Sequence, residues 1–97
     1  GTRIRVPLEV KLSCNDHVKT AMKDQLVDRY IPQLGATHGL YVVAWMSIPD
    51  IGSLRDGHKP KWPSLDTART ELNSQASGLS ESEGVVVRTF VLDASLR

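Results

Sequence analysis

Apolar and polar side chains alternate strictly near the start of the chain, from residue 3 to residue 13. One side carries Ile4, Val6, Leu8, Val10 and Leu12. A period of two is typical of a β-strand with one apolar face. Glu9 and Lys11 then share the polar face, about 6.6 Å apart along the strand. Two interpretations stay open here: a carboxylate beside an ammonium that holds a divalent cation and a polarised water, or the more common half-exposed strand with solvated charges.

The next stretch predicts a helix from about Asp16 to Tyr30. Asn15 is a good N-cap residue in front of it, and Pro32 is expected to end it. At 100° per residue, one face of this helix is apolar and consists of Val18, Ala21, Met22, Leu26 and, at its margin, Tyr30. Gln25 falls within the same arc. Either the apolar stripe tolerates one amide, or Gln25 reaches toward the polar face of the first strand.

Residues 39–46 predict a second strand, which is apolar at both its odd and its even positions. Such a run is typical of an interior parallel strand covered on both faces. A strand, a helix and a parallel strand form a right-handed crossover, which brings the carboxyl ends of the strands and the amino end of the helix to one rim.

Residues 47–63 hold three of the five prolines and predict a long loop, which we expect to lie over that rim. After it, Ser64 is expected to cap a helix that ends near Gly78 and packs through Leu65, Ala68, Leu72 and Ala76. A polar turn over residues 80–84 and a last strand over residues 85–93 follow. The order β-α-β-loop-α-β predicts an α/β fold with a largely parallel sheet.

Composition limits the class of protein. Ninety-seven residues make one small domain, covering residues 1–97, and no apolar run approaches the roughly 18 residues of a membrane span. Cys14 is the only cysteine and no secretory leader is visible, so we expect a cytoplasmic protein without disulfides. A net charge of +1 is too small to attract nucleic acid through the overall field, so any basic footprint is local.

Glu9-Val10-Lys11 on a strand, followed by a helix with Gln25, resembles the second half of the PD-(D/E)XK nuclease core, the restriction-endonuclease-like fold. The resemblance covers about residues 3–46. It implies a domain that hydrolyses DNA, or RNA, with Mg²⁺ or Mn²⁺. Glu9 and the Val10 carbonyl would be metal ligands, Lys11 would position or polarise the attacking water, and Gln25 would flank the site. Hard divalent cations of this kind prefer oxygen ligands and retain waters that can attack a phosphodiester.

The chain departs from the family pattern at two points. The tyrosine of the helix, Tyr30, follows Gln25 by five residues instead of four. The other acidic ligand of the family precedes the E-x-K strand, and this chain begins just before that strand. Asp50 or Asp56 could replace it, or the copy is degenerate; we favour a truncated domain, because Gly1 is not a natural start. The expected partner is then the upstream part of a larger protein or a second chain, including a homodimer, paired through the open sheet edge.

Several polar residues near the rim are candidate nucleic-acid contacts. They are Asn15, His17, Lys59 and Lys61. The alternative to a nuclease is a catalytically inactive α/β module that binds nucleic acid or protein, with Glu9 and Lys11 merely paired on a surface.

Overall fold

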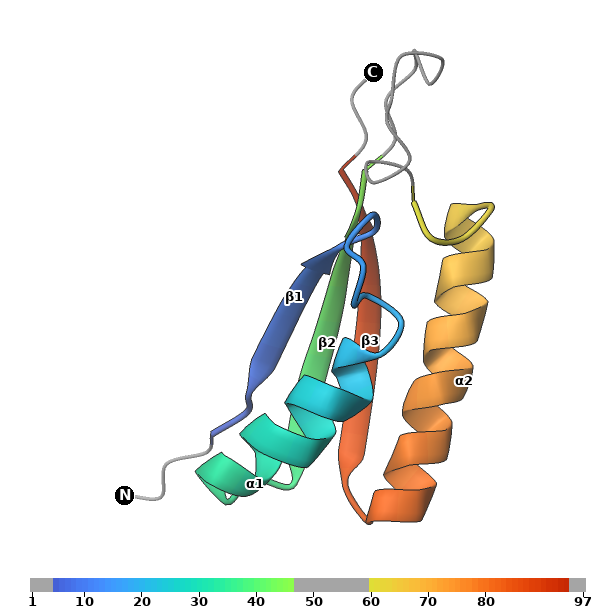
Figure 1. The fold of residues 1–97 in the computed structure, drawn as a ribbon. Helices are drawn as coiled ribbons and strands as arrows, with labels where there is room; N and C mark the ends of the chain where they lie inside the picture. The colour runs from blue at the N-terminus through green and yellow to red at the C-terminus, as the bar shows by residue number, and fades with distance from the viewer. Residues whose placement is uncertain (1–4, 47–59, 95–97) are drawn as a thin grey trace.

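The computed structural model describes residues 5–46 and 60–94. Its strands are β1 (Leu8–Leu12), β2 (His38–Trp45) and β3 (Val86–Asp93), and its helical elements are η1 (Met22–Tyr30), α1 (Ile31–Leu34) and α2 (Leu65–Glu83). All three strands are parallel and lie in the order β1-β2-β3 (Figure 1). The predicted α/β class and parallel sheet are therefore confirmed. The two later strands begin within one residue of the expected positions.

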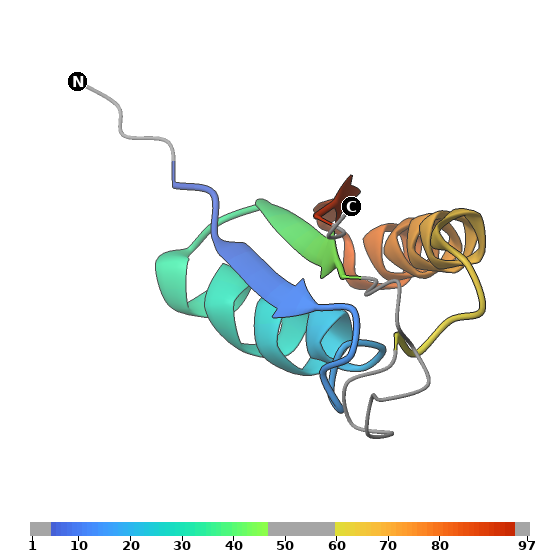
Figure 2. The ribbon, with the colours of Figure 1, turned by 90° about the horizontal axis from the view of Figure 1, so that it is seen from above.

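The helix formed by η1 and α1 and the helix α2 lie on the same side of the sheet, as the view along the strands shows (Figure 2). The strands advance in one direction across the sheet, so two crossovers of the same hand place their helices on one face. The core lies between this covered face and the helices. It is formed mainly by Tyr41, Val43 and Trp45 of β2, Val87 and Val91 of β3, Met22 and Leu26 of η1, and Leu72 and Ala76 of α2.

The expectation that β2 is covered on both faces is wrong for the described part of the chain. Its alternate residues, Leu40 and Val42, are only half-buried. The apolar side of β1 is also open, with Leu8 and Val10 exposed by 54% and 53%. Glu9, on the opposite side, faces the helices. The polar side of β1 is thus the covered side.

The first helical segment differs from the predicted helix over residues 16–30. Residues 15–20 form successive turns, because the Asn15 Oδ1 accepts the His17 N–H at 2.8 Å and the Asn15 carbonyl accepts the Val18 N–H at 3.1 Å. Asn15 therefore caps a turn. Regular helix begins near Met22 as η1, a π-helix, and continues as α1. Pro32 does not end it, because proline is tolerated in the first turn of α1.

The second helix begins where the sequence predicts and ends later. The Ser64 Oγ accepts the Thr67 N–H at 3.1 Å, which confirms the N-cap. The helix continues through the exposed Gly78 to Glu83, so the predicted end and the polar turn over residues 80–84 are wrong. One exposed glycine costs a helix only about 1 kcal/mol, and burial of Leu79 in the next position favours continuation.

Candidate functional site

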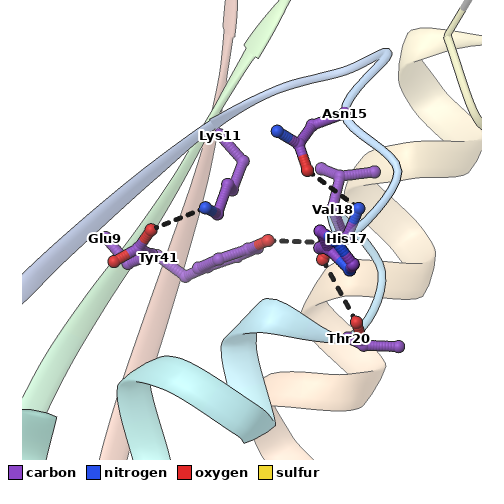
Figure 3. Close-up of polar contacts among 7 residues, drawn as sticks. All are labelled: Glu9, Lys11, Asn15, His17, Val18, Thr20 and Tyr41. Carbon is purple, nitrogen blue, oxygen red and sulfur yellow. Dashed lines mark hydrogen bonds and ion pairs between the residues drawn. The ribbon is translucent and has the colours of Figure 1, made fainter. Parts of the chain in front are cut away.

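Glu9 and Lys11 lie side by side on the covered face of β1. Residues two apart on a strand point to the same side of the sheet. The Lys11 Nζ is 3.2 Å from the Glu9 Oε1, and the two side chains are 19% and 12% exposed (Figure 3). The juxtaposition predicted from the alternating pattern is therefore present. It differs from the expected surface pair in one respect, which is that helices shield it from most of the solvent.

Tyr41 of β2 lies beside this pair, in register with Glu9. Its ring is fully buried, and its hydroxyl donates a hydrogen bond to the Val18 carbonyl at 2.5 Å (Figure 3). Burial raises the pKa of the Tyr41 hydroxyl far above its usual value, and the negative charge of Glu9 raises it further. Tyr41 is therefore a neutral hydrogen-bond donor that holds the turn before η1 against the sheet.

A polar row crosses the covered face at the level of Glu9. The register aligns Glu9, Tyr41 and Thr89 on the three strands. The Thr89 Oγ1 is buried and has no hydrogen-bond partner within residues 5–46 and 60–94. Buried hydroxyls usually have a partner, so the Thr89 hydroxyl is an exception. Glu9 is the only ionisable carboxylate in this row.

The Val10 carbonyl points away from β2, toward the open edge of β1. The Pro7 carbonyl accepts the Leu40 N–H at 2.9 Å, and the Ser13 N–H donates to the Ala44 carbonyl at 3.0 Å. In a parallel ladder these bonds direct the backbone groups of alternate residues toward β2. Val10 belongs to the other set, so its carbonyl faces the open edge of β1, while its side chain lies on the open face of the sheet.

Gln25 is placed in η1 and is half-buried. Within the described part of the chain, no hydrogen bond joins its amide to Glu9 or Lys11. Tyr30, at the end of η1, packs against the core. The helix carrying Gln25 does cover β1, but the structure does not connect this amide to the charged pair.

The rim at the carboxyl end of β1 is held together by Ser13. The Ser13 Oγ accepts the Met46 N–H at 3.0 Å, and the Ser13 carbonyl accepts the Lys61 N–H at 2.9 Å. Met46 and Lys61, on either side of the segment 47–59, are thus held at this rim. The prediction that the loop lies over the rim falls outside the described residues. The loop residues Asp50, Asp56 and Lys59 lie outside the described residues.

The remaining candidate nucleic-acid contacts lie close to this rim. Asn15 uses its side-chain oxygen in the turn, and His17 is exposed. The Lys61 Nζ forms an ion pair with the Asp16 Oδ1 at 3.2 Å. The Lys61 charge is therefore partly neutralised by Asp16, which lies in the turn that contains His17.

The donors around Glu9 agree in kind with a site for a hard cation. Mg²⁺ is commonly held by one or two carboxylates together with substrate phosphates and water. Glu9 supplies one carboxylate and Val10 one carbonyl. In residues 5–46 and 60–94, however, no group of three histidine, cysteine, aspartate or glutamate side chains is arranged to hold a metal.

The sequence prediction missed Tyr41, which lies at the site because the strand register pairs it with Glu9. Its hydroxyl is one of two side-chain polar groups in the run from residue 40 to residue 45, the other being the Trp45 indole N–H, so the sequence alone could have identified it as a candidate. Which residue of β1 it faces depends on strand pairing, and the local pattern does not encode that.

Comparisons of the chain with protein-family models, with curated proteins and with solved structures give no match. Among the helices that the structure describes, none is long and apolar enough to cross a bilayer. The functional interpretation consequently depends on the geometry around Glu9 and Lys11.

Proposed function

We propose that this chain is a metal-dependent nuclease domain of restriction-endonuclease-like fold, which hydrolyses DNA phosphodiesters with Mg²⁺ or Mn²⁺. The observation that supports the proposal is the Glu9–Lys11 pair: a carboxylate and an ammonium 3.2 Å apart on one strand, shielded from most of the solvent by helices. Charges in a shielded site act on a substrate more strongly than charges in water.

Each residue would have a distinct role. Glu9 and the Val10 carbonyl would hold the cation, which supplies a Lewis acid and an acidified water when bound. Lys11 would give up its contact with Glu9 and donate to a phosphate oxygen, stabilising the charge that develops during attack. Gln25 would flank the substrate from η1. A second acidic ligand would come from outside the described residues, with Asp50, Asp56 and a segment preceding Gly1 as the sources.

The second candidate function is a catalytically inactive module that binds nucleic acid or protein. It is favoured by one observation: Glu9 and Lys11 neutralise each other, and no second carboxylate within the described residues joins them. In such a module the pair would be a structural contact within β1.

A cleavage assay separates the two functions. The full-length natural protein is incubated with supercoiled plasmid, linear duplex DNA or single-stranded RNA, with Mg²⁺, Mn²⁺ or EDTA. The nuclease proposal predicts metal-dependent cleavage of DNA that falls to the level seen in EDTA in Glu9→Gln. In Lys11→Met, cleavage should fall by about 100-fold or more, the usual effect of removing one group that stabilises transition-state charge.

Matched variants guard against a general loss of structure. Glu71→Gln and Lys23→Met make the same chemical changes at exposed helix positions and should cleave like the parent protein. Equal cleavage by Glu9→Gln and Glu71→Gln would refute the nuclease role of Glu9. Metal-independent DNA binding without any cleavage by the parent would support the inactive module.

A further inference from the structure

The face of the sheet opposite the helices is apolar and exposed. On it lie alternate residues of all three strands, and the most exposed large ones are Leu8, Val10, Leu12, Phe90 and Leu92. Phe90 and Leu92 are 52% and 58% exposed. Contiguous exposed apolar surface of this kind marks an interaction site in a soluble domain. We refer to these five residues together with Leu40, Val42 and Ala44 as the open face.

Positive charge gathers at one end of the open face. The two arginines Arg5 and Arg88 line an open cavity of about 890 Å³ there, together with His38, Val6 and Leu40. All three basic residues are exposed. Neither the open face nor the described lining of this cavity includes an aspartate or glutamate. A partner with carboxylates at the corresponding end would therefore be complementary in charge.

The width of the open face suits a rod-shaped partner. The register places Ala44 between Leu12 and Leu92, so a single methyl group lies between two leucine side chains. Leu40 and Val42 continue this apolar surface along β2. Three strands about 4.8 Å apart span roughly 10 Å, which matches the diameter of one α-helix.

We propose that the open face binds an amphipathic α-helix of a partner, with its apolar stripe along β2 and its acidic residues against Arg5 and Arg88. The eight residues of β2 extend over about 26 Å, the length of a helix of about 17 residues. Contact between the apolar face of an amphipathic helix and an apolar surface is a common mode of helix recognition. This surface is opposite to Glu9 and Lys11, so the inference is independent of the nuclease proposal.

Two other occupants fit less well. A second copy of the chain would present the same open face, which has no carboxylate to pair with Arg88. An anionic membrane would satisfy the charge, but the basic residues gather at one end of the apolar surface instead of surrounding it. The helix is the occupant that matches charge, width and length together.

The test measures binding of synthetic 17-residue helical peptides to the full-length protein by fluorescence anisotropy. One peptide has a leucine stripe with glutamates at one end, a second has lysines in place of those glutamates, and a third has the first peptide's composition in scrambled order. We expect the glutamate peptide to bind at least about tenfold more tightly than either of the others. Phe90→Thr should weaken it by a similar factor, and Arg88→Glu should reverse the preference between glutamate and lysine.

Arg29→Glu is the matched control, because Arg29 is an exposed arginine of η1 on the other side of the sheet. It should bind the glutamate peptide like the parent. Unfolding curves for Phe90→Thr establish that the variant is folded. Equal affinity for all three peptides, or no binding, would overturn the proposal. So would a dimer in sedimentation that Phe90→Thr dissociates, or tighter binding to anionic vesicles than to the glutamate peptide, because each identifies another occupant.

Discussion

Replacing Glu9 by glutamine and Lys11 by methionine, singly and together, measures how strongly these side chains interact in the folded protein. At 3.2 Å and an effective dielectric constant of about 20, their direct attraction is about 5 kcal/mol. Removing both charges from water offsets much of it. Because the pair is only 19% and 12% exposed, we expect the double-mutant cycle to give a coupling free energy of about 1–3 kcal/mol.

The ion pair between Lys23 and Asp28 is the control. Its atoms are closer, at 2.8 Å, but its side chains are 53% and 45% exposed. Exposed pairs of this kind contribute little to stability because water and salt screen them. The same cycle with Lys23→Met and Asp28→Asn should therefore give the smaller coupling, in spite of the shorter distance.

Urea unfolding provides the assay, with the fluorescence of the buried Trp45 and Trp62 as the signal. Coupling at Glu9–Lys11 should also change less between low and high salt than coupling at Lys23–Asp28. Equal coupling free energies for the two pairs, or a larger one at Lys23–Asp28, would refute the inference that helices shield Glu9 and Lys11.

Three further variants test the packing around the site. Tyr41→Phe should lower the free energy of unfolding by about 1–3 kcal/mol, because it leaves the Val18 carbonyl without its donor. Because the pKa of the Tyr41 hydroxyl is raised in the folded state, the stability that this hydroxyl contributes is complete below pH 10.0 and is lost as the pH rises above that value. In alkaline titrations monitored by circular dichroism, Tyr41→Phe should therefore lose less stability than the control Tyr30→Phe. Gly39→Ala should destabilise by about 1–3 kcal/mol, because its Cβ would lie 2.8 Å from the Ile31 Cδ1, and an unchanged urea midpoint would contradict this packing. Gly78→Ala, in the exposed middle of α2, should stabilise by about 0.5–1 kcal/mol, and a lower midpoint would argue against a continuous helix there.

The strands were predictable from the sequence because their signals are local. Alternation identifies β1, and short apolar runs identify β2 and β3 within one residue of their starts. The side of the sheet that the helices cover is not a local property. Alternation would place Leu8 and Val10 in a core, but both crossovers cover the other face and leave these residues exposed. The late end of α2 likewise reflects burial of Leu79, which outweighs the helix-breaking tendency of Gly78.

The site was predictable only in part, for a related reason. The adjacency of Glu9 and Lys11 follows from the two-residue period of a strand. The contact of Tyr41 with this pair requires the register between β1 and β2, which the pairing of distant segments determines. The direction of Gln25 depends on where the helix begins, and the Asn15 turn delays that start to Met22.

Binding of Mn²⁺ to the full-length protein tests the proposed role of Glu9 most directly. A titration followed by electron paramagnetic resonance of the free ion counts the bound ions and measures their affinity. We predict that Glu9→Gln loses one site or binds it at least about tenfold more weakly, while Glu71→Gln binds like the parent. Identical Mn²⁺ binding by Glu9→Gln and the parent protein would contradict a metal site at this carboxylate.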